Sequence, residues 1–216
     1  WGDDKQVYLF VVPPVPSFPL NPKKMDWSKW EWQDVAANWN WAGYENKQIK
    51  IEVYSSCKEV ELFLNEKSLG KKKTNRNTRW IATWDVSYQP GVLRAVGYND
   101  PGEETSCELK TAEDPRKIVL SADRNAITAD GQDLSYVTVE LLDAKGVRNP
   151  LAQNSIRFDI EGPGSILAVG SSNPMGTESF KQPMRNAYQG RCLVIVRSTS
   201  GTGEIKLKAT SDDLEP

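Results

Sequence analysis

The chain has 216 residues, which is enough for one large domain or two small ones, each able to bury a hydrophobic core. Its 27 basic and 29 acidic side chains give a net charge of -2, which argues against charge-driven binding to nucleic acid or an anionic membrane. The absence of histidine excludes Ser-His-Asp triads, a histidine general base and histidine-ligated zinc.

No apolar run reaches the roughly 18 residues of a membrane span, and no segment has the pattern of a signal peptide. The chain begins at Trp1 and is interpreted as part of a longer polypeptide. Near its start, residues 13–22 contain five prolines, and such a run is extended and cannot form a central strand.

Alternation of apolar and polar residues predicts short strands in the first half of the chain. The alternating runs lie at 49–53, 60–64, 80–84 and 92–96. Asn65, Glu66 and Lys67 follow the run at 60–64 and are predicted to separate the two strands of a hairpin. The third run places Trp80 and Trp84 on the same side of a strand, so both are predicted to pack in the core.

The second half of the chain repeats this pattern. Alternating runs lie at 117–121, 137–141, 156–160 and 205–209. The run at 192–196 is apolar on both faces and predicts a central strand, and Asp143–Gly146 predicts a tight turn. With essentially no helix, the chain is predicted to be all-β, as two tandem Ig-like or fibronectin-like β-sandwiches spanning 1–113 and 114–216.

The tryptophans are the most informative side chains. All eight lie at or before Trp84. Their flat rings can stack on sugar rings, but buried tryptophan is also a large core residue. Core packing is favoured for Trp39 and Trp41. Trp27, Trp30 and Trp32 lie in an irregular segment, and three alternatives stay open for them: packing onto this domain, docking onto a neighbouring domain, and contact with a sugar.

The charged clusters favour structural roles. Glu59 and Glu61 lie on one strand face, which is typical of a solvated surface and does not designate the carboxylate pair of a glycosidase. Lys71–Lys73 with Arg76 and Arg79 are predicted to form an exposed hairpin tip.

The sequence requires no metal and no cofactor. Residues 130–133 are acidic but lack the spacing of a calcium loop, and they are interpreted as a turn. Cys57, Cys107 and Cys192 show no CxxC spacing and are interpreted as small buried residues.

Several motifs in order resemble one family. They are Trp39-Asn40-Trp41-x-Gly43, the run from Val53 to Gly70, Trp84-Asp85-Val86-x-Tyr88-x-Pro90-Gly91, the run from Leu120 to Glu140, Asn173-Pro174 through Phe180, and Gly190 to Val196. From Trp39 to Leu214 the chain resembles the C-terminal accessory β-sandwiches of glycoside hydrolase family 2, the β-galactosidase-like enzymes of Bacteroidetes. The second half is similar to their C-terminal invasin-like, Ig-like domain.

This resemblance implies a division of labour. The two catalytic glutamates of the family lie in a barrel upstream of Trp1, so no residue of this chain is expected to be catalytic. The parent enzyme is expected to be a retaining exo-glycosidase, with β-galactosides as its expected substrates. The region described would serve as a scaffold whose partners are that barrel and the oligo- or polysaccharide substrate, and a homo-oligomer is left open. A periplasmic or outer-surface location is also implied.

Two departures from the family pattern concern recognition of the substrate. Residues 13–37, rich in Pro and Trp, correspond to an insertion, and Asn38 stands where the family has histidine. The residues expected to contact substrate are therefore Trp27, Trp30, Trp32, Asn38, Trp39, Asn40 and Trp41. The alternatives are a carbohydrate-binding module, on the strength of the tryptophans, and an Ig-like surface adhesin, on the strength of residues 117–210.

Overall fold

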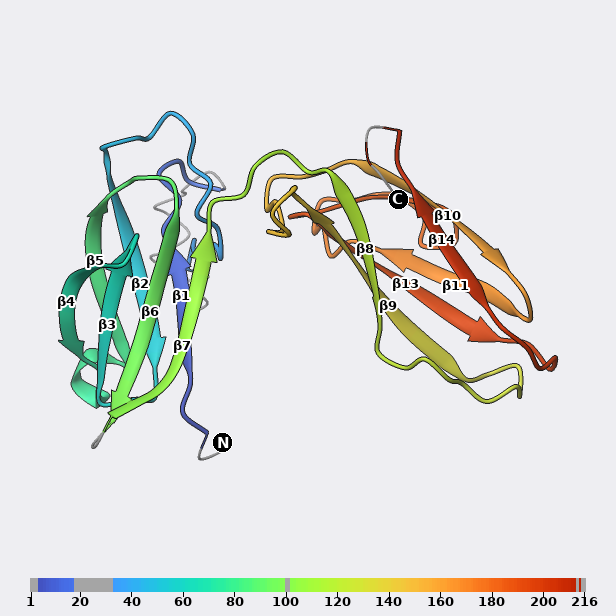
Figure 1. Cartoon of the computed structure of the whole chain (residues 1–216), viewed down its shortest axis with the longest axis horizontal. Coiled ribbons are helices and arrows are strands. Elements are labelled where there is room, and N and C mark those ends of the chain that lie inside the picture. Colours follow the sequence, from blue (N-terminus) through green and yellow to red (C-terminus); the bar gives the residue numbers. More distant parts are fainter. Residues whose placement is uncertain (1–3, 18–32, 100–101, 213, 215–216) are drawn as a thin grey trace, which may run out of the picture. The chain divides into compact units, whose positions relative to one another are not determined.

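The computed structural model describes residues 4–17, 33–99, 102–212 and 214, and the chain divides into two compact units, Trp1–Thr111 and Ala112–Pro216. Figure 1 shows the strands of the first unit in blue to green and those of the second in yellow-green to red. The predicted all-β fold class is confirmed, since the described residues contain strands and a single 3-10 turn, η1 (Arg76–Thr78).

The first unit consists of two antiparallel sheets. One has the order β1-β2-β5, from β1 (Val7–Val11), β2 (Gln48–Ser55) and β5 (Ile81–Ser87). The other has the order β4-β3-β6-β7, from β3 (Glu59–Leu64), β4 (Lys67–Lys73), β6 (Val92–Asn99) and β7 (Gly102–Lys110). Alternate residues of both sheets turn inward, so that Ile51 and Val53 of one sheet share a buried cluster with Leu62 and Leu93 of the other.

The lysine-rich segment differs from its predicted form. Lys71–Lys73 are part of strand β4 rather than a loop, and β4 pairs with β3 so that Lys73 lies opposite Glu59 and Lys71 opposite Glu61. The strand is exposed and lies at the edge of its sheet, where charged side chains are tolerated and discourage pairing with other chains. Only the segment that follows it, with Arg76 and Arg79, forms a turn.

The prediction that Trp80 packs in the core is wrong. Trp84 and Ala82 of β5 are buried, but β5 begins at Ile81 and the Trp80 side chain is 49% exposed. Arg79 and Trp80 both have left-handed backbones, with φ of 54° and 63°. Strand β5 therefore begins one residue after Trp80, and Trp80 does not share the inward face of Ala82 and Trp84.

The second unit also has two antiparallel sheets. One has the order β11-β13-β9-β8, from β8 (Lys117–Ala122), β9 (Leu134–Leu142), β11 (Gly164–Gly170) and β13 (Arg191–Ser198). The other has the order β12-β10-β14, from β10 (Ser155–Glu161), β12 (Met184–Asn186) and β14 (Lys206–Thr210). The strand β13 is internal to its sheet, in agreement with its apolar pattern, and its Val194 is fully buried.

All three cysteines are free thiols. Cys57 and Cys192 are buried, as predicted, whereas Cys107 is only half-buried. Burial raises the pKa of the Cys192 thiol to about 12, which keeps it protonated and unreactive at neutral pH. Cys57 packs against Gly97, where a Cβ would lie only 2.6 Å from the Cys57 sulfur, so this glycine permits a close approach of the strands.

The connection between the units is held on both sides. Thr111 is bound to the first unit, because its backbone N–H donates to Gly91 O at 2.9 Å and its hydroxyl donates to Trp39 O at 2.7 Å. Glu113 is bound to the second unit, because its N–H donates to the Asp143 carboxylate at 2.9 Å and its carbonyl accepts from the Asn149 amide at 2.8 Å. Each unit therefore fixes its own end of the connection.

Candidate functional site

The segment that precedes β2 is built around Trp39. This side chain is fully buried, and its Nε1–H donates to Gln89 O at 3.1 Å. Its ring meets the Tyr88 ring edge-to-face, with 4.8 Å between centroids. Trp39 therefore has no surface with which to contact a sugar, which corrects the expectation that it binds substrate; the competing interpretation, core packing, describes it.

Tyr88 connects Trp39 to the next part of the segment. It is 1% exposed, and its hydroxyl donates to Trp39 O at 3.4 Å. The hydroxyl oxygen of Tyr88 in turn accepts a hydrogen bond from the Trp41 N–H at 3.1 Å. The backbone of Tyr88 also exchanges hydrogen bonds with residues 46–47, since its N–H donates to Lys47 O and its carbonyl accepts from Asn46 N–H, each at 2.9 Å. The segment is thus fixed to the end of β5 by main-chain and side-chain contacts.

The remaining candidates lie at the surface of this framework. Trp41 is half-buried against the core, and its Nε1–H donates to Asn38 O at 3.1 Å. The side-chain oxygen of Asn38 accepts a hydrogen bond from the Asn40 N–H, two residues further along the chain, at 2.7 Å. Asn38 and Asn40 are half-buried as well. The structure therefore brings Asn38, Asn40 and Trp41 together as a partly exposed ridge, which we call the 38–41 ridge.

Tyr44 extends this surface, and the sequence patterns did not single it out. It is half-buried, its N–H donates to Trp41 O at 3.0 Å, and the Lys47 ammonium lies 4.7 Å from its ring centroid. No alternation or motif marks Tyr44 in the sequence, because it lies in an irregular segment where residue spacing does not indicate a shared face.

The predicted sites Trp27, Trp30 and Trp32 lie outside the described residues. The residues that flank their segment are held close together: Val11 and Ala36 exchange two backbone hydrogen bonds of 2.9 and 2.8 Å, and Ser17 N–H donates to the Asp34 carboxylate at 2.7 Å.

Two models of protein families match the chain. The model described as glycoside hydrolase family 2 C-terminal domain 5 matches residues 118–216, and a model described as a domain of unknown function (DUF4982) matches residues 46–106. Each match lies within one of the two structural units.

Among proteins of solved structure, a glycosyl hydrolase family 2 member from Bacteroides cellulosilyticus is 47% identical to this chain with a TM-score of 0.93, over all of this chain and 28% of the other. The chain belongs to the C-terminal, non-catalytic region of glycoside hydrolase family 2.

Curated relatives agree with this family 2 assignment. A β-galactosidase from Bacteroides ovatus is 35% identical over 208 residues, which are 95% of this chain and 24% of that protein. A β-galactosidase from Thermoanaerobacter pseudethanolicus is 32% identical over 182 residues, 77% of this chain and 23% of that protein. The chain thus spans about a quarter of the length of the curated relatives it matches.

Carboxylates in this family 2 region are engaged in structural contacts. Glu61, one of the paired acids on β3, accepts hydrogen bonds from Ser68 at 2.6 Å and Tyr98 at 3.2 Å and lies 3.7 Å from the Lys71 ammonium. These contacts tie strands β4, β3 and β6 together on the outer face of their sheet, so Glu61 is occupied as a structural acceptor.

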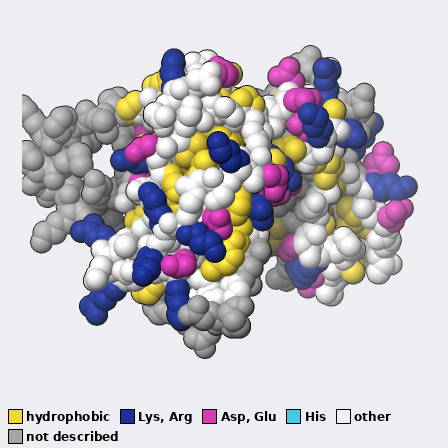
Figure 2. Space-filling model, turned by 60° about the vertical axis from the view of Figure 1, so that its left-hand side comes forward, with side chains coloured by type: hydrophobic (Ala, Val, Ile, Leu, Met, Phe, Trp, Pro, Cys, Tyr) yellow, Lys and Arg dark blue, Asp and Glu magenta, His cyan; other side chains and the backbone are white. Residues whose placement is uncertain are grey.

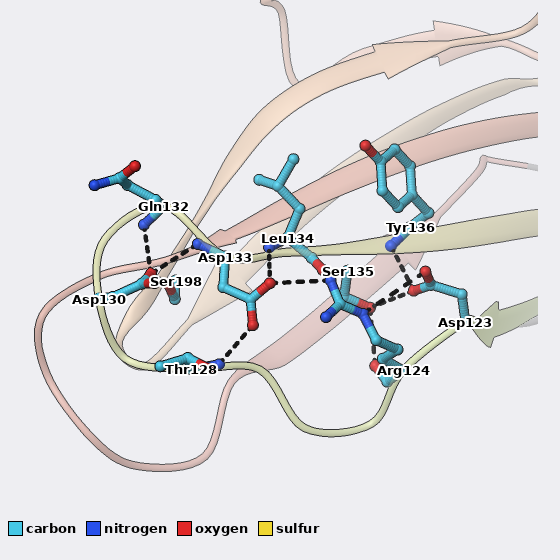
Figure 3. A network of polar contacts seen from close by, with 10 residues as sticks. All are labelled: Asp123, Arg124, Thr128, Asp130, Gln132, Asp133, Leu134, Ser135, Tyr136 and Ser198. Carbon is cyan, nitrogen blue, oxygen red and sulfur yellow. Dashed lines mark hydrogen bonds and ion pairs between the residues drawn. The ribbon is translucent and has the colours of Figure 1, made fainter.

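The acidic turn of the second unit is organised in the same way, as Figure 3 shows. Asp130 accepts from the N–H groups of Gln132 and Asp133, both at 2.8 Å, and Asp133 accepts from Thr128 N–H at 2.8 Å and from the Arg124 guanidinium at 3.0 Å. Hydrogen bonds from backbone N–H groups lower the pKa of both carboxyls. The prediction of a turn at 130–133 is confirmed, and its carboxylates serve the loop.

Two further features are absent from the part of the chain that the structure describes. Within the described ranges, no group of three or more Cys, Asp or Glu side chains is arranged to hold a metal ion. In the same ranges, no helix has the length and apolar character needed to cross a membrane.

Proposed function

We propose that the whole protein is a retaining exo-β-glycosidase that removes terminal β-linked sugars, with β-galactosides as its substrates, and that its catalytic barrel lies in the same polypeptide. The proposal is supported by the two curated relatives named β-galactosidase. A further relative, from Formosa agariphila, is named β-glucuronidase and is 27% identical over 177 residues, which supports the wider class of β-glycosidases. Reaction through two carboxyl groups in the barrel follows from the family resemblance.

Within that enzyme, the first unit would act as a scaffold that presents the 38–41 ridge at the rim of the substrate site. The observation that carries this role is the burial of Trp39, whose contacts with Tyr88, Gln89 and Thr111 fix the backbone beneath the ridge. A side chain on a rigid support loses little entropy when it meets a ligand. Trp41 supplies a partly exposed indole ring, and Asn38 and Asn40 supply amides.

The division of labour is tested by comparing the 216-residue chain with the whole protein on p-nitrophenyl β-galactoside. We expect turnover by the whole protein and none by the chain alone. Turnover by the chain at the rate of the whole protein would overturn the assignment of catalysis to the barrel.

The rim is tested in the whole protein with Trp41→Ala and Asn40→Ala. A rim contact predicts that KM for a β-linked oligosaccharide rises about tenfold, while kcat for the small aryl substrate changes less than twofold. Tyr136→Ala is the matched control, because Tyr136 is an exposed aromatic residue of β9 (Leu134–Leu142) in the second unit and is not part of the ridge. Equal kinetics of all three variants would exclude the ridge from the substrate site.

We also propose a periplasmic or outer-surface location, which the family resemblance supports. Fractionation of the source cells, followed by detection of the protein with an antibody against this region, tests the proposal. Recovery with the cytoplasmic fraction would refute it.

A further inference from the structure

The connection between β4 and β5 concentrates positive charge on a chain whose net charge is -2. From Lys67 to Trp84 the sequence has no acidic residue, and it has six basic ones: Lys67, Lys71, Lys72, Lys73, Arg76 and Arg79. Arg76 and Arg79 are exposed and form no ion pair within the part of the chain that the structure describes. Figure 2 shows several Lys and Arg side chains, with fewer Asp and Glu side chains among them, on the face of the first unit that this view brings forward.

One large aromatic side chain stands in this basic turn. Trp80 is 49% exposed, whereas Trp84, four residues later, is 6% exposed. Between Lys73 and Trp80 the other side chains are Thr, Asn and Arg. A protein interface usually surrounds its tryptophan with further apolar side chains, and this turn has none.

The turn holds Trp80 in place at an energetic cost. Arg79 and Trp80 adopt left-handed backbones, with φ of 54° and 63°, which are unfavourable for residues other than glycine. Three hydrogen bonds keep them there: Trp80 N–H donates to Asn75 O at 2.9 Å, Arg79 N–H to Arg76 O at 3.1 Å, and Ser55 N–H to Trp80 O at 3.0 Å. A strained and well-bonded backbone that exposes a tryptophan indicates a surface prepared for a ligand.

The base of the turn is anchored to the sandwich. Thr74 is 2% exposed, its hydroxyl donates to Cys57 O at 2.6 Å and its N–H donates to Lys58 O at 2.9 Å. Asn75 then accepts from the N–H groups of Asn77 and Thr78 through its side chain, at 2.8 and 3.2 Å. The position of Trp80 is therefore fixed before any ligand arrives.

From these contacts we propose that the Trp80 turn, residues 73–80, binds acidic glycan chains whose sugars carry carboxylate groups. The indole ring supplies a flat face for the apolar side of a sugar ring. Arg79 and Arg76 supply planar guanidinium groups that can bind carboxylates through paired hydrogen bonds. The binding is non-covalent and needs no metal.

This site is separate from the 38–41 ridge. Trp80 precedes the first residue of β5 and Tyr88, which supports the ridge, follows its last residue. Seven strand residues at roughly 3.3 Å each put about 23 Å between the two ends. The Trp80 turn would thus hold a polysaccharide at a distance from the ridge, and it does not depend on the proposed function of the ridge.

The experiment uses the 216-residue chain labelled with 5-fluorotryptophan and observed by fluorine NMR. The Trp80 resonance is assigned by its loss in Trp80→Phe. The probe is a galacturonic acid oligosaccharide, and the matched control is the same oligosaccharide with its carboxylates methyl-esterified. We expect the acidic form to shift the Trp80 resonance saturably. We expect the esterified form to bind at least about tenfold more weakly.

Variants assign the contacts by isothermal titration with the same probe. We expect Trp80→Ala to abolish measurable binding and Arg79→Gln to raise Kd about fivefold or more. A double variant that removes two exposed lysines of the second unit, Lys117→Gln with Lys208→Gln, removes more charge and is expected to leave Kd within twofold.

Several outcomes would overturn the proposal. Equal binding of the acidic and esterified probes would reduce the site to stacking alone, and equal loss in the double lysine variant would reduce it to general charge. Tighter binding of a single-stranded oligonucleotide than of the glycan would assign the turn to nucleic acid. A Trp80 resonance that is shielded from solvent in the whole protein would assign the turn to contact with another domain.

Discussion

At the scale of single residues, two tryptophans of the first unit occupy opposite environments. Trp39 is fully buried and hydrogen-bonded, whereas Trp80 is half exposed on a turn. We expect Trp39→Ala to lower the free energy of unfolding of the first unit by about 3–5 kcal/mol, because it leaves a large cavity. We expect Trp80→Ala to change it by about 0.5 kcal/mol or less, since exposed side chains contribute little.

Urea denaturation of the two variants, followed by circular dichroism, measures both values. A shift in the midpoint without a change in slope would report stability alone. Equal destabilisation by the two substitutions would contradict the burial that separates them.

A second residue, Asp143, makes the stability of the second unit depend on pH. The carboxylate is fully buried and accepts from the N–H groups of Glu113, Lys145 and Val147 at 2.8–2.9 Å. Burial opposes its ionisation, but these hydrogen bonds outweigh burial and lower the pKa of Asp143 below its usual 3.8. Because the pKa is lower in the folded state, the stabilisation is complete above about pH 4 and is lost as the pH falls through the folded pKa.

We expect Asp143→Asn to destabilise the second unit at pH 7 by about 1–3 kcal/mol, because its amide nitrogen would face the Glu113 N–H without an acceptor. The Tm of the variant should also fall less than that of the wild type between pH 6 and pH 3. Calorimetry across this range measures both, and parallel curves for the two proteins would contradict the assignment.

At the scale of elements, the β3–β4 hairpin shows how turn chemistry and structure agree. Asn65 and Glu66 both have left-handed backbones, with φ of 48° and 65°, as a two-residue hairpin turn requires. Asn65 suits its position because its side chain donates to Pro90 O at 3.0 Å and accepts from Val92 N–H at 2.8 Å. Glu66 makes only an exposed ion pair with Arg94 at 3.7 Å, so its backbone strain is not offset by a strong contact.

Replacing Glu66 with Gly should therefore stabilise the first unit by about 0.5–1 kcal/mol, because glycine adopts this backbone without strain. The control, Asn65→Gly, should destabilise it, because it removes the two side-chain hydrogen bonds. Thermal unfolding of both variants measures the difference, and a loss of stability in Glu66→Gly would show that the ion pair with Arg94 outweighs the strain.

Strands with one buried face were predictable from the sequence, and strands without such a face were not. Residues 49–53 of β2 and 137–141 of β9 alternate clearly because one side chain in two enters the core. Strand β4 carries mostly lysine and glycine and is a strand because β3 pairs with it, and β7 was missed because Cys107 and Leu109 are only partly buried in an otherwise polar run. Local pattern carries no information about such pairing.

The candidate site was predictable in part for a similar reason. The sequence drew attention to residues 38–41, but spacing alone could not show that Trp39 faces inward while Trp41 is only half-buried. Trp80 is the reverse case, since its alternation with Trp84 predicts burial and two left-handed residues prevent it. In both places the backbone outside regular strands decides which face a ring takes.

At the scale of the whole molecule, each unit has its own hydrophobic cluster. One contains Leu62 and Trp84 and the other contains Val139 and Phe158. We expect two unfolding transitions in calorimetry, with Trp39→Ala lowering only one of them and Asp143→Asn only the other. A single transition that both substitutions shift equally would contradict this separation.

The connection described above also bears on how such regions are inherited. Thr111 is fixed to one unit and Glu113 to the other, so the single residue Ala112 separates the two sets of contacts. A recombination event at Ala112 would leave Thr111 with its hydrogen bonds to the first unit and Glu113 with its hydrogen bonds to the second. Gene rearrangement at this point would therefore leave the end of each sandwich closed, so that either could be exchanged as a cassette of its own, although the relative from Bacteroides ovatus, which matches 95% of the chain, carries both halves together.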